Sequence, residues 1–349
     1  MTTVDILFMT IISLTSAAVI GWGARVLPAE KWQILAAVPG NKRDDGTWAG
    51  RNLTYYGVIV ASAYTVSVSI FLLLMSSTGA SMTAILIMTG LVLVVCVPAS
   101  KLLAIVVEKK RHTFTVGGAS FVGMIVAPWI WYAIREQTGS GTTVTVSMAA
   151  LAIAYAFGEG FGRLACISFG CCYGRRVADL SPFWQKIFRR FHFTFTGQTK
   201  KIAYAHGWDG QPVIPVQLIT SVLYIAAGLT GIAFFLNGLA APAFLIPLMT
   251  TQLWRVLSEF LRADFRGEER RLTAYQIMAL ATIPYAGAVA LIFGAPAPFH
   301  PDIAAGLKAL WRPGVLLSVQ LLWLLIFLQT GRSMVTGSRM SFFFHQDRI

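Results

Sequence analysis

Nine apolar runs of 17 to 23 residues determine what this chain can fold into. A helix of about 20 apolar residues crosses a bilayer, and the runs lack the alternating pattern of barrel strands. Only 12% of the residues are charged, whereas soluble domains carry about 25%. We therefore predict an all-α polytopic membrane protein of about nine transmembrane helices, at residues 4–26, 54–75, 82–104, 117–134, 144–162, 218–236, 241–262, 273–293 and 314–330.

Basic residues gather on one side of the predicted bundle. When the loops are numbered alternately, the side of the N-terminus holds only Arg135, Lys308 and Arg312, and nearly all other basic residues lie opposite. The positive-inside rule would place that basic side in the cytoplasm. Anionic phospholipid headgroups would attract the same cations. The net charge of +13 therefore indicates membrane lipid, and not nucleic acid, as the partner.

One long polar connection, at about residues 164–214, separates the fifth and sixth apolar runs. It mixes aromatic with basic residues, among them Trp184, Arg189 and Arg190. Flexible linkers are poor in aromatic residues. The composition predicts a small folded head domain on the membrane surface.

Charged side chains within the apolar runs mark a candidate site. Glu159 and Arg163 lie four residues apart at the end of the fifth run. In the seventh run, Arg255, Glu259 and Arg262 are spaced i, i+4 and i+7, which puts them on one helix face. Charges inside a membrane helix usually face a polar cavity or a substrate path. A structural ion pair between Arg255 and Glu259, and an Arg262 that snorkels to the interface, are the simpler alternatives.

Further polar motifs lie on the same basic side. Tyr56 opens the second run, while a basic stretch that includes His112 precedes Gly117 and Gly118 at the start of the fourth. Tyrosine at a span end is also typical of the aromatic belt, and paired glycines are typical of helix packing. Convergence of these motifs with two arginines predicts a phosphate-binding pocket, because Arg suits bidentate contact.

Three of the four cysteines lie together, as Cys166, Cys171 and Cys172. Structural zinc sites prefer two closely spaced pairs, and the sequence has no second pair. We therefore predict neither a metal site nor a cofactor, and interpret these cysteines as small residues that pack a tight turn.

These motifs resemble, in order, those of the prolipoprotein diacylglyceryl transferases. The resemblance covers about residues 52–293. It rests on Tyr56-Gly57, Phe114 with Gly117-Gly118, Gly162-Arg163 followed by Gly174-Arg175, Pro215-Val216-Gln217-Leu218, Arg255-x3-Glu259-Phe260-x-Arg262 and Tyr275-Gln276-Ile277. It predicts a core at 53–293 that includes the head, an added N-terminal helix and loop at 1–52, and an added C-terminal helix and basic tail at 294–349.

The resemblance also implies an activity. Members bind phosphatidylglycerol in the bacterial inner membrane and transfer its diacylglyceryl group to a cysteine thiol of a prolipoprotein signal peptide. It implies catalytic roles for Arg163, Arg255 and Glu259. The substrate-binding residues that we expect are Tyr56, His112, Gly117, Gly118, Glu159, Gln217 and Arg262.

The sequence departs from the family pattern at four positions. The family histidine before the two glycines is Thr115 or Val116 here, its asparagine is Cys166, its later acidic residue is Cys171, and the acidic residue after Gln217-Leu218 is lost. Family members also work on the outer face of the membrane, opposite to the charge rule. A related phospholipid-using transferase with a different acceptor, and a non-catalytic lipid-binding subunit, are therefore the alternatives.

Overall fold

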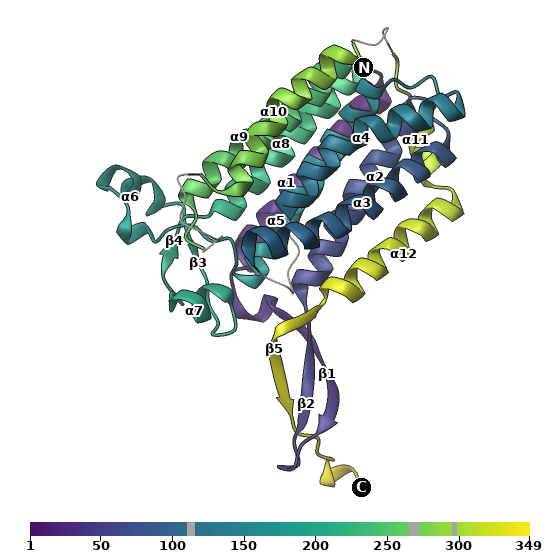
Figure 1. The fold of residues 1–349 in the computed structure, drawn as a ribbon. Helices are drawn as coiled ribbons and strands as arrows, with labels where there is room; N and C mark the ends of the chain where they lie inside the picture. Colours follow the sequence, from purple (N-terminus) through teal and green to yellow (C-terminus); the bar gives the residue numbers. More distant parts are fainter. Residues whose placement is uncertain (110–115, 265–271, 295–298) are drawn as a thin grey trace.

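The computed structural model describes residues 1–109, 116–264, 272–294 and 299–349, and shows a bundle of long helices (Figure 1). A long helix covers each of the nine predicted runs, which confirms the all-α polytopic architecture. By length and composition, eight described helices can cross a membrane. These are α1 (Thr3–Val26), α2 (Tyr55–Ser77), α3 (Met82–Glu108), α4 (Val116–Thr138), α5 (Val144–Phe169), α8 (Val216–Leu236), α10 (Ala274–Ile292) and α12 (Pro313–Thr330).

The ninth helix, α9 (Ala240–Leu261), is as long as the others but more polar. Its second half contains Thr250, Thr251, Gln252, Arg255 and Glu259. Thr251, Gln252 and Arg255 are buried against the rest of the bundle, so α9 turns its polar face inward. This arrangement fits a membrane helix that lines a site and avoids presenting polar groups to lipid.

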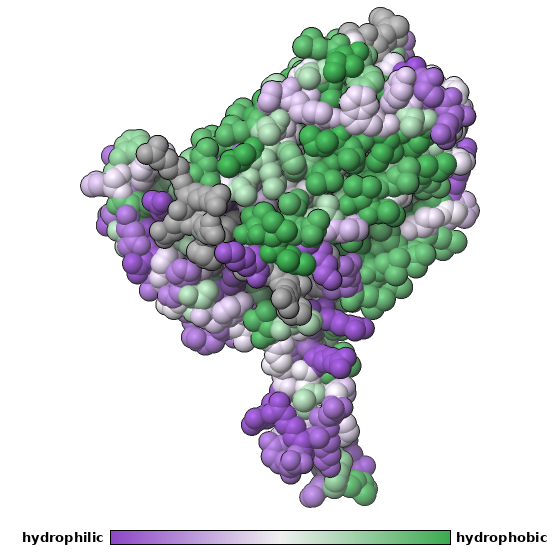
Figure 2. All heavy atoms as spheres, viewed as in Figure 1, coloured by the Kyte–Doolittle hydropathy of each residue, from purple (hydrophilic) through white to green (hydrophobic). Residues whose placement is uncertain are grey.

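Helix α5 is the centre of the bundle. Of its 18-residue apolar window, 78% is buried, compared with 11% in α3 and 6% in α12. It packs on α2, α8 and α9, and small residues allow the close approach: Gly158 lies against Ser67, and Gly228 against Phe157. Apolar side chains cover much of the face of the bundle that Figure 2 shows, which suits contact with lipid.

The head follows α5 and contains η2 (Val177–Asp179), α6 (Pro182–Phe188), β3 (Phe193–Thr194), α7 (Lys201–His206) and β4 (Pro212–Val213). Strands β3 and β4 pair antiparallel. The predicted start of the polar connection at 164 is too early, because α5 continues to Phe169. Leu164 and Ile167 are buried in the last part of this helix. They share an apolar cluster with Tyr173 and Phe195, so the end of α5 is packed into the head.

Lys200 attaches the head to the bundle. Its side chain is fully buried, and Nζ donates to the carbonyl oxygens of Leu27, just after α1, and Ser168, near the end of α5, at 3.1 and 2.8 Å. Burial lowers the pKa of Lys200 to about 8, although Glu30 acts in the opposite direction. The two helix ends are thus held together by one amine.

Segments near the two ends of the chain, before α2 and after α12, form a sheet that the sequence did not indicate. Strands β1 (Ile34–Lys42), β2 (Trp48–Thr54) and β5 (Arg332–Met340) make an antiparallel sheet in the order β1-β2-β5. It projects from the same end of the bundle as the head (Figure 1). Two short 3-10 turns, η1 (Glu30–Trp32) and η3 (Gln346–Arg348), and helix α11 (Ile303–Leu310) complete the chain.

Candidate functional site

An ionic cluster joins α5 to α9 inside the bundle. Glu159 pairs with Arg163 one turn later on α5, and its other carboxylate oxygen lies 3.1 Å from Nη2 of Arg255 on α9. The same Nη2 donates to the hydroxyl of Tyr155 at 2.6 Å. Glu159 and Arg255 are each only 8% exposed. We call Glu159, Arg163 and Arg255 the inner cluster.

The inner cluster has more positive charge than negative. One carboxylate faces two guanidinium groups, and the Nε atoms of Arg163 and Arg255 are buried without a hydrogen-bond partner. Leaving a buried donor unpaired costs free energy, more so when it is charged. An anion with several acceptor oxygens would supply both the missing charge and the missing acceptors.

Gly117 on α4 lies directly against this cluster. A β-carbon at this position would stand 2.7 Å from Nη1 of Arg255 and 2.8 Å from Cδ1 of Tyr275, which is buried. Any larger residue would displace the guanidinium. Gly118 is buried beside it. The structure therefore brings Gly117 together with Arg255, as expected for a residue that shapes the site, although its role remains a prediction.

A second ionic cluster lies at the end of α9. Arg262 donates from Nε and Nη2 to Asp264 at 2.9 and 2.8 Å, and from Nη1 to Glu259 at 3.5 Å. We call these three residues the junction cluster. The backbone here joins the head, since Gly174 bridges Arg262 and the Ala263 amide donates to the Tyr173 carbonyl.

The partners of Arg255 and Glu259 differ from those that helical spacing suggests. Arg255 pairs across helices with Glu159, and Glu259 pairs with Arg262 three residues on. Spacing along one helix identifies only neighbours on that helix, so it could not reveal the acid on α5. Tyr155 was likewise missed, although Tyr155, Glu159 and Arg163 follow each other at four-residue intervals, which was the available signal.

Two further predicted residues, Gln217 and Tyr56, lie around the turn that follows α5. Gln217 on α8 donates from Nε2 to the Cys171 carbonyl at 2.8 Å, and its Oε1 is buried without a partner. The Tyr56 ring packs on Phe169, with centroids 5.8 Å apart. His112 and Phe114 lie outside the described residues.

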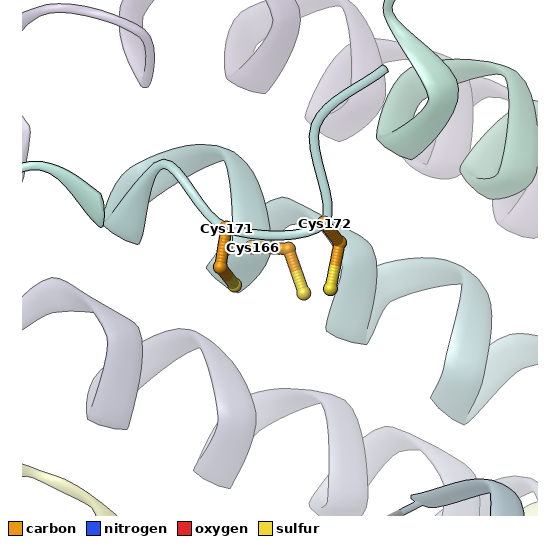
Figure 3. Close-up of side chains that lie close together, drawn as sticks. All are labelled: Cys166, Cys171 and Cys172. Carbon is orange, nitrogen blue, oxygen red and sulfur yellow. The ribbon is translucent and has the colours of Figure 1, made fainter. Parts of the chain in front are cut away.

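The three neighbouring cysteines come together in this turn (Figure 3). The sulfur atoms of Cys166, Cys171 and Cys172 all lie within 4.8 Å of one another, and no disulfide bond joins them. The expectation of a tightly packed turn describes the backbone, but not this grouping of sulfur atoms.

Comparison with known proteins identifies the family. The family model for prolipoprotein diacylglyceryl transferases matches residues 48–293, which include every described residue of both ionic clusters. No curated protein matches the chain. The chain belongs to the prolipoprotein diacylglyceryl transferase family, whose name describes transfer of a diacylglyceryl group to prolipoproteins.

Proposed function

We propose that this multi-pass membrane transferase takes its diacylglyceryl group from phosphatidylglycerol and attaches it to a cysteine thiol of a prolipoprotein signal peptide. We place the reaction in a bacterial inner membrane. Family membership supports the transfer. The observation that carries the donor is the inner cluster, in which two buried guanidinium groups share one carboxylate and keep two unpaired Nε donors.

In the proposed reaction, the thiol sulfur attacks the carbon of the diacylglyceryl group that is bonded to the phosphate oxygen. A carbon–sulfur bond forms as the carbon–oxygen bond breaks, and glycerol phosphate leaves with the electron pair. The thiol proton ends on that phosphate monoester or in the solvent. Arg163 and Arg255 would stabilise the charge that grows on the leaving group. Glu159 would orient both arginines, and Glu259 would act only through Arg262.

A specific observation favours a second candidate. Cys166 and Cys171 occupy positions where the family pattern carries an asparagine and an acid, and Thr220 follows Gln217 where an acid is expected. The cations that would bind the donor are thus retained, whereas groups near the acceptor have changed. A transferase with the same donor and a different nucleophile fits that pattern, and so does a lipid-binding subunit without catalysis.

Mass spectrometry of a lipobox peptide separates these functions. Purified protein is incubated with phosphatidylglycerol and the peptide, and the diacylglyceryl mass is expected on its cysteine. A peptide with serine at that position is the control. If the peptide gains no mass under conditions where another family member modifies it, the acceptor is not a prolipoprotein. Lipid analysis of a deletion strain then identifies the second candidate, through loss of one lipid class.

The side of the membrane tests the acceptor independently. Lys186 is exposed on α6 of the head, so Lys186→Cys offers a thiol for a membrane-impermeant maleimide. Labelling in intact cells from which the outer membrane has been removed would support an exported acceptor. Labelling only after the inner membrane is opened would contradict it. The wild-type protein, with its four cysteines, serves as the background.

A further inference from the structure

The turn after α5 brings three thiols to one point. Cys166 lies in the last turn of α5, while Cys171 and Cys172 follow the helix end. Their sulfur atoms lie within 4.8 Å of one another, and in Figure 3 the three side chains extend from the turn to the same side of the backbone. Adjacent residues in an extended chain point to opposite faces, so this arrangement requires a special backbone.

The backbone supplies that geometry with two left-handed residues. Gly170 (φ 71°) ends α5, and the Cys171 amide donates to the Cys166 carbonyl at 3.0 Å. Cys172 is also left-handed (φ 59°), which is uncommon for a residue that is not glycine and is often found at functional sites. Gln217 holds the Cys171 carbonyl at 2.8 Å. The turn is therefore fixed on both sides before any ligand arrives.

The spacing of the sulfur atoms suits one metal ion. With metal–sulfur bonds of about 2.3 Å, three thiolates around an ion lie roughly 4 Å apart, so small side-chain rotations complete the site. The guanidinium groups of Arg163 and Arg262 lie near Cys172, and that of Arg163 also near Cys166. They would offset the negative charge of thiolates.

We propose that Cys166, Cys171 and Cys172 bind one thiophilic cation with a filled d shell, of the class of Zn²⁺ and Cu⁺. Thiolate sulfur selects these ions over harder ones. Each thiol loses its proton as a metal–sulfur bond forms, so binding releases three protons per ion. Among the described residues, no fourth side chain of a metal-binding type joins the group. Cu⁺ would be three-coordinate, and Zn²⁺ would take a fourth ligand in addition to the three thiolates. The site does not depend on the proposed donor or acceptor.

Metal stoichiometry of the full-length protein tests the proposal. The reduced protein is loaded with Zn²⁺ or, in a second arm, with Cu⁺, then dialysed and analysed by elemental mass spectrometry. We expect about one ion per chain in the wild-type protein. Cys166→Ser and Cys171→Ser should each retain roughly tenfold less metal. Cys96→Ser is the matched control, because Cys96 lies on α3 outside the cluster and should leave binding unchanged. The arm that retains the ion identifies the metal.

A measurement on the wild-type protein removes any dependence on variant folding. Bound metal should protect Cys166, Cys171 and Cys172 from alkylation and leave the rate at Cys96 unchanged. Several results would overturn the proposal: background metal in both arms, equal metal in wild type and Cys166→Ser, alkylation of the three cysteines at the same rate with and without metal, or a disulfide within the cluster in protein purified without oxygen.

Discussion

The inner and junction clusters both combine arginine with carboxylate side chains but differ in their balance of charge and hydrogen bonds. The inner cluster holds two arginines and one acid, and both Nε donors lack partners. The junction cluster holds one arginine and two acids, and all three nitrogens of Arg262 donate. A saturated arginine joins backbone segments, whereas an unsaturated pair retains capacity for an anion. A charged side chain in a membrane helix therefore indicates an anion-binding site only if its hydrogen-bond and ion-pair partners leave some of its capacity unused.

Removing the shared acid should have the largest effect. Glu159→Gln leaves Arg163 and Arg255 buried beside a neutral amide, and breaking a buried ion pair costs about 3 to 5 kcal/mol. Thermal unfolding in detergent measures the loss, and inorganic phosphate should restore part of it by binding the folded state. Glu136→Gln on the exposed surface is the control. Unchanged stability would show that the inner cluster is not held by Glu159.

Replacing each arginine by glutamine should affect the transfer rate differently in the two clusters. Arg163→Gln and Arg255→Gln each remove a donor aimed at the proposed phosphate, and we expect transfer to fall about 10²- to 10³-fold. Arg262→Gln should reduce transfer far less but lower thermal stability, because it detaches the head from α9. The measurement is the initial rate with labelled phosphatidylglycerol. Equal losses in all three variants would remove the distinction drawn between the clusters.

Crowding the inner cluster should have an intermediate effect. Gly117→Ala places a β-carbon 2.7 Å from Nη1 of Arg255, and overpacking of this kind costs about 1 to 3 kcal/mol. The displaced guanidinium should raise the KM for the donor. Gly287→Ala on α10 is the matched control, since a β-carbon there meets nothing within 4 Å. A normal KM in Gly117→Ala would place the donor away from Arg255.

Lys200, a buried cation outside both clusters, should show the smallest effect. Burial lowers its pKa from 10.5 to about 8, so the unfolded chain holds more protons than the native protein above pH 8. Stability should therefore rise between pH 7 and pH 9, by about 1 kcal/mol. Lys200→Met should abolish that rise, while Lys201→Met, one residue along, should keep it. A rise that persists in Lys200→Met would assign it to another group.

The long helices could be predicted from the sequence because each covers a continuous apolar run, whether that run is buried in the bundle or exposed on its surface. The sheet could not, since β5 pairs with β2 near the other end of the chain and no local pattern encodes that pairing. The same limit applies to the site. The position of Arg163 and Arg255 followed from charge in apolar runs, but the choice of Glu159 over Glu259 as the partner of Arg255 depends on how α5 packs on α9.

The sequence predicted a tight turn at the three cysteines but not the grouping of their sulfur atoms, for a related reason. The sequence shows three cysteines and a glycine, and Gly170 does cap α5 as glycine commonly does. Nothing in the sequence indicates that Cys172 also becomes left-handed, and that conformation is what turns neighbouring side chains to one side. A non-glycine residue in this region is held there by its surroundings, which arise only when the head packs on the bundle.

The order of synthesis gives the sheet a further consequence. Asn52 on β2 bonds Thr336 on β5, 284 positions later. At about 5 to 20 residues per second, the ribosome needs roughly 15 to 60 s to supply that partner. During this interval the edge of β2 that β5 will cover stays open, and an open strand edge invites pairing with other chains. Production of this protein should therefore be sensitive to translation speed and to chaperones that shield the hairpin of β1 and β2 until α12 has been inserted.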